Sequence, residues 1–260
     1  MAQTPQLDLH EAADELGVHY QTAYRWVRTG KLPAAMVNGR YVVSRADLEA
    51  VEQRRSTPRS PEAPSRRRLD HAAERMHDAM VAGDEAAARQ IAGKLADEGA
   101  SVRDVAQHVL VPPLRHIGQA WHDGELTIWV EHRAAAITER ILGELAPNPR
   151  GRRRGTAMVA AVAGDRHSLP TSMAALALRD DNWHVHHLGA DMPPAELVGF
   201  CADHDVDVAV LTVTNPSTLL AATEVAGELG EAGVPTIVGA PGRSLDELID
   251  RARTARSRAA

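Results

Sequence analysis

The apolar residues in the middle of the chain recur at helical spacing. Between residues 69 and 145 they predict helices near 69–81, 84–98, 101–119 and 128–146, separated by breaks that contain glycine. Four helices that each carry an apolar face bury those faces by packing together. The sequence therefore predicts a four-helix bundle in this part of the chain.

The C-terminal part has a different pattern, in which short apolar runs alternate with helical segments. The runs predict strands near 156–162, 183–188, 207–213 and 235–239. This alternation is typical of a parallel sheet with helices on both faces. Because arginine-rich sequence follows Ile249, we expect a flavodoxin-like (Rossmann-type) domain with only four parallel strands.

The N-terminal part predicts a compact helical module with a hairpin. Gly17 separates a helical segment near 11–16 from a second segment near 19–28. Two short strands follow, joined by Asn38-Gly39, the strongest two-residue hairpin signal. This order predicts a winged helix-turn-helix domain.

Composition marks the boundaries of a multidomain α and α/β chain. A stretch rich in proline, serine and arginine precedes the bundle and is typical of a linker. We expect a winged helix-turn-helix DNA-binding domain at 1–54, a linker at 55–68, the bundle at 69–148 and the α/β domain at 149–260.

Charge and cysteine content narrow the function classes. The formal net charge of −6 excludes a protein that coats nucleic acid through its overall field, so any DNA contact must use local basic surface. One cysteine, Cys201, excludes an internal disulfide and a thiolate metal cluster. With no leader and no apolar run near the ~20 residues that span a bilayer, we expect a soluble, cytoplasmic protein without a membrane partner.

The second helix of a helix-turn-helix enters the major groove, so its outward positions should be polar or basic. Arg40, at the hairpin tip, is placed to reach a phosphate or the minor groove. The remaining residues expected to face DNA are Gln21, Thr22, Tyr24, Arg25 and Arg28. Those expected to face the core are Val18, Ala23, Trp26 and Val27.

The same module resembles the winged helix-turn-helix domains of the MerR and excisionase type. The similarity lies in the L-x-x-x-E-A-A-x-x-L-G-V start, in Tyr24-Arg25-Trp26 and in the Gly30-Lys31-Leu32-Pro33 exit. A small helical interaction domain with a solvated basic face is the alternative.

Asp165-Arg166-His167 stands where the first predicted strand of the α/β domain gives way to a helix. Open parallel sheets bind ligands beyond the carboxyl ends of their strands. Asp165 can hold one ring nitrogen of His167 and leave the other free to bind a metal. Taken alone, this D-x-H spacing also fits a polar loop histidine that binds nothing.

The bundle carries a second motif, W-x9-E-H, formed by Trp121 and by Glu131-His132 at the start of its last predicted helix. Taken alone, the motif predicts a core tryptophan and a surface pair. Together with the domain order and the D-x-H motif, it resembles the cobalamin-dependent light-sensing repressors of the CarH type. The resemblance covers nearly the whole chain.

The resemblance implies adenosylcobalamin as cofactor, with His167 as the lower axial ligand of cobalt and Asp165 as its partner. Ser217-Thr218-Leu219 is similar to the S-x-L element of the family, in which the serine meets the nucleotide tail. Gly239 would let backbone and tail come close.

The resemblance also assigns the upper side of the cofactor. Trp121 would cover the adenosyl group, Ile128 would pack beside it, and Glu131 would bond to its ribose. His132 would become the upper axial ligand after light has broken the cobalt–carbon bond.

The function implied is a light-responsive transcriptional repressor and not an enzyme. Such a protein binds a double-stranded DNA operator as a homo-oligomer, a tetramer in the dark, and releases it when the oligomer dissociates. Tetramers gain affinity because linked modules bind at high effective concentration.

The chain departs from the family pattern at three places. Pro170 replaces the glycine of D/E-x-H-x-x-G, Ala240 replaces the second glycine of Gly-Gly, and a fifth strand is missing. Each departure is expected to weaken cofactor binding.

Other assignments stay open. The chain could be a MerR-like regulator whose cobalamin-type domain binds another corrinoid or none, or a corrinoid carrier of a methyltransferase system. Trp121 and Glu131-His132 disfavour a carrier, which must leave the upper face open. His184 and His186 share one face of a predicted edge strand and form a possible metal pair, and 150–154 predicts a solvated arginine-rich linker.

Overall fold

The computed structural model describes residues 6–16, 20–28, 32–37, 39–48, 51, 64–146, 151–240 and 242–259. The chain divides into two compact units, Met1–Glu62 and Ala63–Ala260. The predicted linker at 55–68 lies mostly outside the described residues, and its last residues already belong to a helix. None of the described helices is long and apolar enough to cross a membrane.

The first unit is a small helical module with a three-stranded antiparallel sheet. Helix α1 (Leu9–Glu15) and helix α2 (Tyr20–Arg28) precede strands β2 (Ala35–Val37) and β3 (Arg40–Ser44). The predicted hairpin is present, and Gly39 has the positive φ that a two-residue hairpin turn requires.

Strand β1 (Gln6–Asp8) was not predicted, and it pairs with β3 so that the sheet order is β1-β3-β2. Its last residue, Asp8, caps α1: the carboxylate accepts the N–H groups of His10 and Glu11, and the Glu11 side chain accepts the N–H of Asp8. The core of the unit consists of Leu9, Ala12, Ala13, Leu16, Ala23, Leu32, Val43, Leu48 and Val51.

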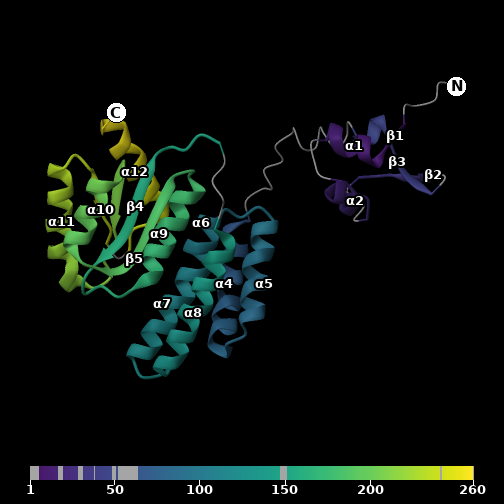
Figure 1. The fold of residues 1–260 in the computed structure, drawn as a ribbon. Helices are drawn as coiled ribbons and strands as arrows, with labels where there is room; N and C mark the ends of the chain where they lie inside the picture. The colour runs from purple at the N-terminus through teal and green to yellow at the C-terminus, as the bar shows by residue number, and fades with distance from the viewer. Residues whose placement is uncertain are drawn as a thin grey trace. The chain divides into compact units, whose positions relative to one another are not determined.

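The second unit begins with the predicted bundle. Helices α4 (Arg66–Ala82), α5 (Glu85–Asp97), α7 (Val111–His122) and α8 (Ile128–Leu145) pack side by side (Figure 1). Their boundaries lie within a few residues of those predicted from periodicity. The fully buried side chains Met76, Met80, Leu110, Ile117 and Ile137 fill the centre of the bundle.

The single helix predicted over 101–119 is divided into three pieces. A short helix α6 (Val102–Asp104) and a π-helical segment η1 (Val105–Leu110) precede α7. Pro112 and Pro113 follow η1. A proline lacks the N–H of a regular helical turn and its ring clashes with the carbonyl four residues earlier, so we attribute the wider turn to this pair.

The C-terminal part is a four-stranded parallel sheet, as predicted. The strands are β4 (Thr156–Val162), β5 (His184–Met192), β6 (Val208–Leu211) and β7 (Thr236–Val238), in the order β5-β4-β6-β7. Their parallel pairing places all four carboxyl ends at one edge of the sheet. That edge is where the fold class places its ligand.

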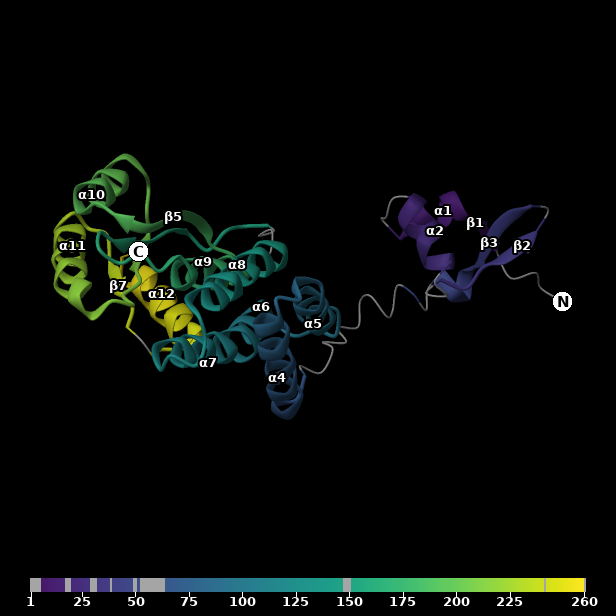
Figure 2. The same cartoon turned by 90° about the horizontal axis from the view of Figure 1, so that it is seen from below.

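Two helices cover each face of this sheet (Figure 2). Helices α9 (Ser168–Asp180) and α12 (Leu245–Ala259) lie on one face, and α10 (Pro194–Asp203) and α11 (Leu219–Glu231) lie on the other. Helix α12 follows β7 through a short loop, so it packs beside α9 without an intervening fifth strand.

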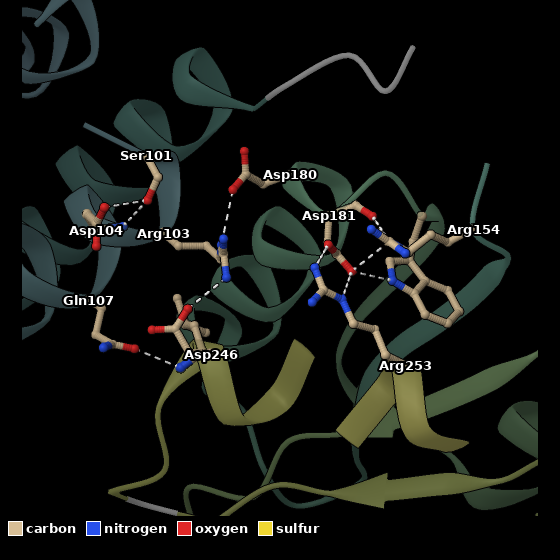
Figure 3. A network of polar contacts seen from close by, with 11 residues as sticks. Ser101, Arg103, Asp104, Gln107, Arg154, Asp180, Asp181, Asp246 and Arg253 are labelled. Carbon is tan, nitrogen blue, oxygen red and sulfur yellow. Dashed lines mark hydrogen bonds and ion pairs between the residues drawn. The ribbon is translucent and has the colours of Figure 1, made fainter. Parts of the chain in front are cut away.

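Asp181 holds the second half of α12 in place. Arg253 of α12 and Arg154, which precedes β4, converge on its buried carboxylate (Figure 3). The indole N–H of the fully buried Trp183 donates to the same carboxylate at 3.2 Å. Burial raises the pKa of Asp181, but the Arg253 and Trp183 hydrogen bonds and both arginine charges lower it below its ordinary value.

Candidate functional site

A cavity of about 1130 Å³ lies between the bundle and the carboxyl ends of the sheet strands. Ligand sites of drug-sized molecules measure about 300–1,000 Å³, so this cavity has room for a larger cofactor. The residues predicted from both motifs meet here. Trp121, Ile128, Glu131, His132, His167 and Gly239 line the cavity.

His167 lies at the end of the β4–α9 loop and is held from behind by Asp165. Its Nδ1 is 2.7 Å from Asp165 Oδ1, and its backbone N–H donates to the same oxygen. Asp165 is 0% exposed, whereas the His167 side chain is 57% exposed. The imidazole therefore has Nδ1 occupied, and Nε2 is left for a ligand in the cavity.

The second oxygen of Asp165 is also bound. Its Oδ2 accepts the backbone N–H groups of Thr214 at 2.6 Å and of Asn215 at 3.0 Å. Burial raises the pKa of Asp165, but these N–H groups and His167 together lower it below its ordinary value. The carboxylate stays charged and fixes the orientation of the ring.

The opposite wall belongs to the bundle and is much more exposed. Trp121 ends α7 and Ile128 begins α8, and both leave large apolar surfaces uncovered. His132 Nδ1 is 2.6 Å from Glu131 Oε2, and the His132 side chain is 72% exposed. The bundle wall therefore offers apolar surface beside an exposed imidazole.

The structure does not bring every predicted residue to the cavity. Ser217 donates its hydroxyl to Asn215 Oδ1 at 2.9 Å, and neither Ser217 nor Leu219 lines the cavity wall. Both residues lie where a short 3-10 turn passes into α11. Pro170 and Ala240, the two departures from the family pattern, do line the cavity.

Several lining residues were not predicted. Gln107, Arg115, Arg243, Glu247 and Arg251 surround the cavity with polar and charged groups. Of these, Gln107 lies at helical spacing before Trp121, which was the available sequence signal, whereas Arg115 does not. The other three follow β7, where the sequence gives no motif that points to a site.

Glu139 connects the two walls. It lies two helical turns after His132 on α8, and its carboxylate accepts the hydroxyl of Ser168 at 2.9 Å and that of Ser172 at 3.0 Å. Both serines belong to the first turns of α9, directly after His167. A carboxylate at a helix N-terminus is favoured by the helix dipole.

The candidate metal pair His184 and His186 lies on the edge strand β5, as expected. Their rings are 4.7 Å apart, and His204 lies 5.5 Å from His186. Across the residues that the structure describes, no group of three or more His, Cys, Asp or Glu residues could hold a metal ion. A metal at the His167 cavity would therefore need a cofactor to supply its other ligands.

The DNA-facing prediction is described only in part. Tyr24 and Arg28 are exposed on α2, and Ala23 is buried with Trp26 and Val27 packed against the core, as predicted. The side chains of Gln21, Thr22, Arg25 and Arg40, and the whole of Val18, lie outside the described residues.

Tyr24 belongs to a row of aromatic side chains that was not predicted. The ring of Tyr20 stacks on His10 at 4.1 Å, and Tyr24 meets Tyr41 edge to face at 5.9 Å.

Three family models match the chain. Residues 7–56 match a helix-turn-helix domain, residues 72–146 match a B12 binding domain, and residues 155–252 match a second B12 binding domain. The two B12 matches coincide with the bundle and the α/β domain, whose facing surfaces form the cavity.

The chain is similar to the HTH-type transcriptional repressor CarA of Myxococcus xanthus, with 32% identity over 126 residues. The aligned part is 46% of this chain and 41% of CarA, so the match spans about two fifths of that relative. The monomethylamine corrinoid protein of Methanosarcina barkeri shares the fold at 18% identity and a TM-score of 0.54, over 73% of this chain and 97% of its own. With the domain matches, the CarA similarity confirms the predicted resemblance to CarH-type proteins.

Proposed function

Because the chain joins a helix-turn-helix domain to two B12 binding domains, we propose that it is a cobalamin-dependent transcriptional repressor that responds to light. The similarity to CarA supports DNA binding and repression as its output. In the dark the protein holds adenosylcobalamin and binds an operator as an oligomer. Light releases the operator. We expect the protein to act in the cytoplasm.

The observation that carries the proposal is the pairing of two different histidine sites across one cavity. Asp165 holds His167 on one wall, while Glu131 and His132 lie on the other wall beside Trp121. A corrinoid between them would have a nitrogen ligand below and an apolar cover above.

The residues present fit this cofactor. His167 has one ring nitrogen already bound to a carboxylate, which is the usual arrangement of a metal-ligating histidine. When bound, adenosylcobalamin supplies a cobalt–carbon bond that light breaks. With the cofactor bound, Trp121 and Ile128 would exclude water from the face turned toward the bundle, and His132 is the side chain that we expect to ligate the cobalt after light.

Oligomer formation is the step that we propose links the cavity to DNA. A single helix-turn-helix binds with modest affinity, whereas several modules held together bind at high effective concentration. If a change at His132 moves α8, the oligomer surface changes and the modules separate. Tyr24 and Arg28 of α2 are exposed and available to the groove.

The test is purification in the dark with adenosylcobalamin, followed by absorption and elution volume before and after green light. The proposal predicts a bound corrinoid spectrum, a spectral change with light, and a later elution after light. Absence of any bound corrinoid would contradict it and favour a regulator that senses something else.

A corrinoid carrier for methyl transfer is the second candidate, because the fold is shared with the monomethylamine corrinoid protein. The bundle wall argues against it, since Trp121 and Ile128 would stand between the cobalt and a methyl donor. Corrinoid binding without any light-driven change in elution would favour this candidate.

A further inference from the structure

One continuous row of residues lines the cavity from the bundle side. Gln107, Val111, Leu114, Gly118 and Trp121 all line the cavity. They follow one another at intervals of three or four residues, which places them on one side of η1 and α7. The row therefore extends along the cavity from Trp121 to Gln107.

The row continues beyond the cavity to Arg103, four residues before Gln107. Arg103 lies between Asp180 of α9 and Asp246 of α12 (Figure 3). Its Nε is 3.1 Å from Asp180 Oδ2 and its Nη1 is 2.7 Å from Asp246 Oδ1. The side chains of Arg103 and Asp180 are largely covered, so solvent and salt screen this pair less than an exposed one.

The side chain of Gln107 contacts the backbone of the same turn of α12. Its Oε1 accepts the N–H of Leu245, the first residue of α12, at 2.8 Å. The first four N–H groups of a helix have no partner within the helix. The bundle thus satisfies a donor at the start of α12 that the α/β domain leaves open.

The start of α12 is itself part of the cavity wall. Ser244, Leu245, Glu247, Leu248 and Arg251 all line the cavity. In this fold with four strands, α12 begins shortly after β7, and its second half is held separately by Asp181. Arg103 and Gln107 supply the polar contacts between this first turn and the bundle, beside the packing of Leu245 against both cores.

We propose that Arg103 and Gln107 are positioning residues that hold the first turn of α12 against the bundle and so complete the cofactor cavity. Through them, a displacement of α7 also displaces α12. The inference takes the identity of the ligand from the proposed function. The contacts of Arg103 and Gln107 with α12 do not depend on that function.

The experiment compares Gln107→Leu, Gln107→Glu and Arg103→Ala with a matched control, Arg140→Ala. Arg140 forms an equally direct pair with Glu85, to which its Nε and Nη2 each donate at 2.8 Å, and that pair lies within the bundle. The readouts are hydrogen exchange at the Leu245 amide without cofactor and the Kd for adenosylcobalamin in the dark.

Gln107→Leu removes the acceptor, so we expect exchange at Leu245 to rise about tenfold and the Kd to rise by a similar factor. Gln107→Glu keeps an acceptor and places a carboxylate at a helix N-terminus, so protection at Leu245 should return. Arg103→Ala should raise the Kd, and Arg140→Ala should leave both readouts unchanged.

Unchanged exchange at Leu245 in Gln107→Leu would overturn the inference. Faster exchange with an unchanged Kd would also overturn it, because the contact would then be structural only. If the wild-type protein bound no adenosylcobalamin, the proposed function would fail, and the exchange rates would still decide whether the bundle holds α12.

Discussion

Two carboxylate–histidine pairs face each other across the cavity, and their hydrogen bonds are almost equally short. Asp165 to His167 measures 2.7 Å and Glu131 to His132 measures 2.6 Å. Yet Asp165 is fully buried and also accepts three backbone N–H groups, whereas Glu131 is partly exposed and its partner is mostly exposed. The surroundings of a bond, and not its length, decide how firmly it holds a side chain.

This difference predicts distinct roles for the two histidines. His167 is fixed by a charged group that cannot leave without exposing unsatisfied donors. His132 is held by a bond between solvated side chains, which contributes little and can be exchanged for another partner. This asymmetry suits a lower ligand that stays in place and an upper ligand that changes.

The sharpest test of the comparison removes each carboxylate in turn. Asp165→Ala leaves the N–H groups of Thr214 and Asn215 without their acceptor, so the free energy of unfolding should fall by about 2–4 kcal/mol. Glu131→Ala should cost less than about 0.5 kcal/mol. Urea unfolding followed by circular dichroism measures the free energy of unfolding of both variants. Equal losses would contradict the difference between the two pairs.

Removing each imidazole tests the same asymmetry in binding. His167→Ala should weaken dark adenosylcobalamin binding at least about tenfold, because even the loss of a ligand's hydrogen-bond partner costs about 10- to 100-fold. His132→Ala should leave dark binding within about threefold and change only the spectrum after light. Titration in the dark and a spectrum after illumination provide the check. A light spectrum that His132→Ala leaves unaltered would count against its assignment.

A smaller effect is expected where the two walls meet. Glu139→Ala removes the acceptor of Ser168 and Ser172, which should cost about 1–2 kcal/mol of unfolding free energy and raise hydrogen exchange in the first turns of α9. Glu144→Ala is the matched control, because Glu144 pairs with Arg89 inside the bundle. Similar exchange in both variants would show that Glu139 does not connect the walls.

The smallest expected effect is a pH dependence of the α/β side. Burial and Arg179 lower the pKa of His187 below its ordinary value of 6.5, against an opposing effect of Glu139. The unfolded chain therefore binds the proton first, so this stabilisation is present above pH 6.5 and is lost as the pH falls. His187→Gln should flatten the fall in unfolding free energy between about pH 7 and pH 5. An unchanged slope would contradict this.

The asymmetry was only half visible in the sequence. D-x-H and W-x9-E-H locate both pairs, and periodicity locates the elements that carry them. The donors that fix Asp165 come from Thr214 and Asn215, about fifty residues later, and only the fold brings them together. Glu139 follows His132 at helical spacing, but nothing local in the sequence shows that its partners are Ser168 and Ser172.

The fold was predictable where the pattern is local. The helices of the bundle and the four parallel strands follow from spacing, whereas strand β1 depends on pairing with β3 across the module. The π-helical segment before Pro112 and Pro113 breaks a helix that periodicity treats as continuous. Ser217 fits a family motif by spacing, yet its hydroxyl is bonded to Asn215, because spacing does not set the direction of a side chain.

The central claim is that one histidine stays bound and the other changes its partner. It is tested most directly by spectra of the protein with adenosylcobalamin, before and after green light, in wild type, His167→Ala and His132→Ala. The account predicts a histidine-ligated dark spectrum that requires only His167, and a light spectrum that requires both. A dark spectrum that is unchanged in His167→Ala would contradict it.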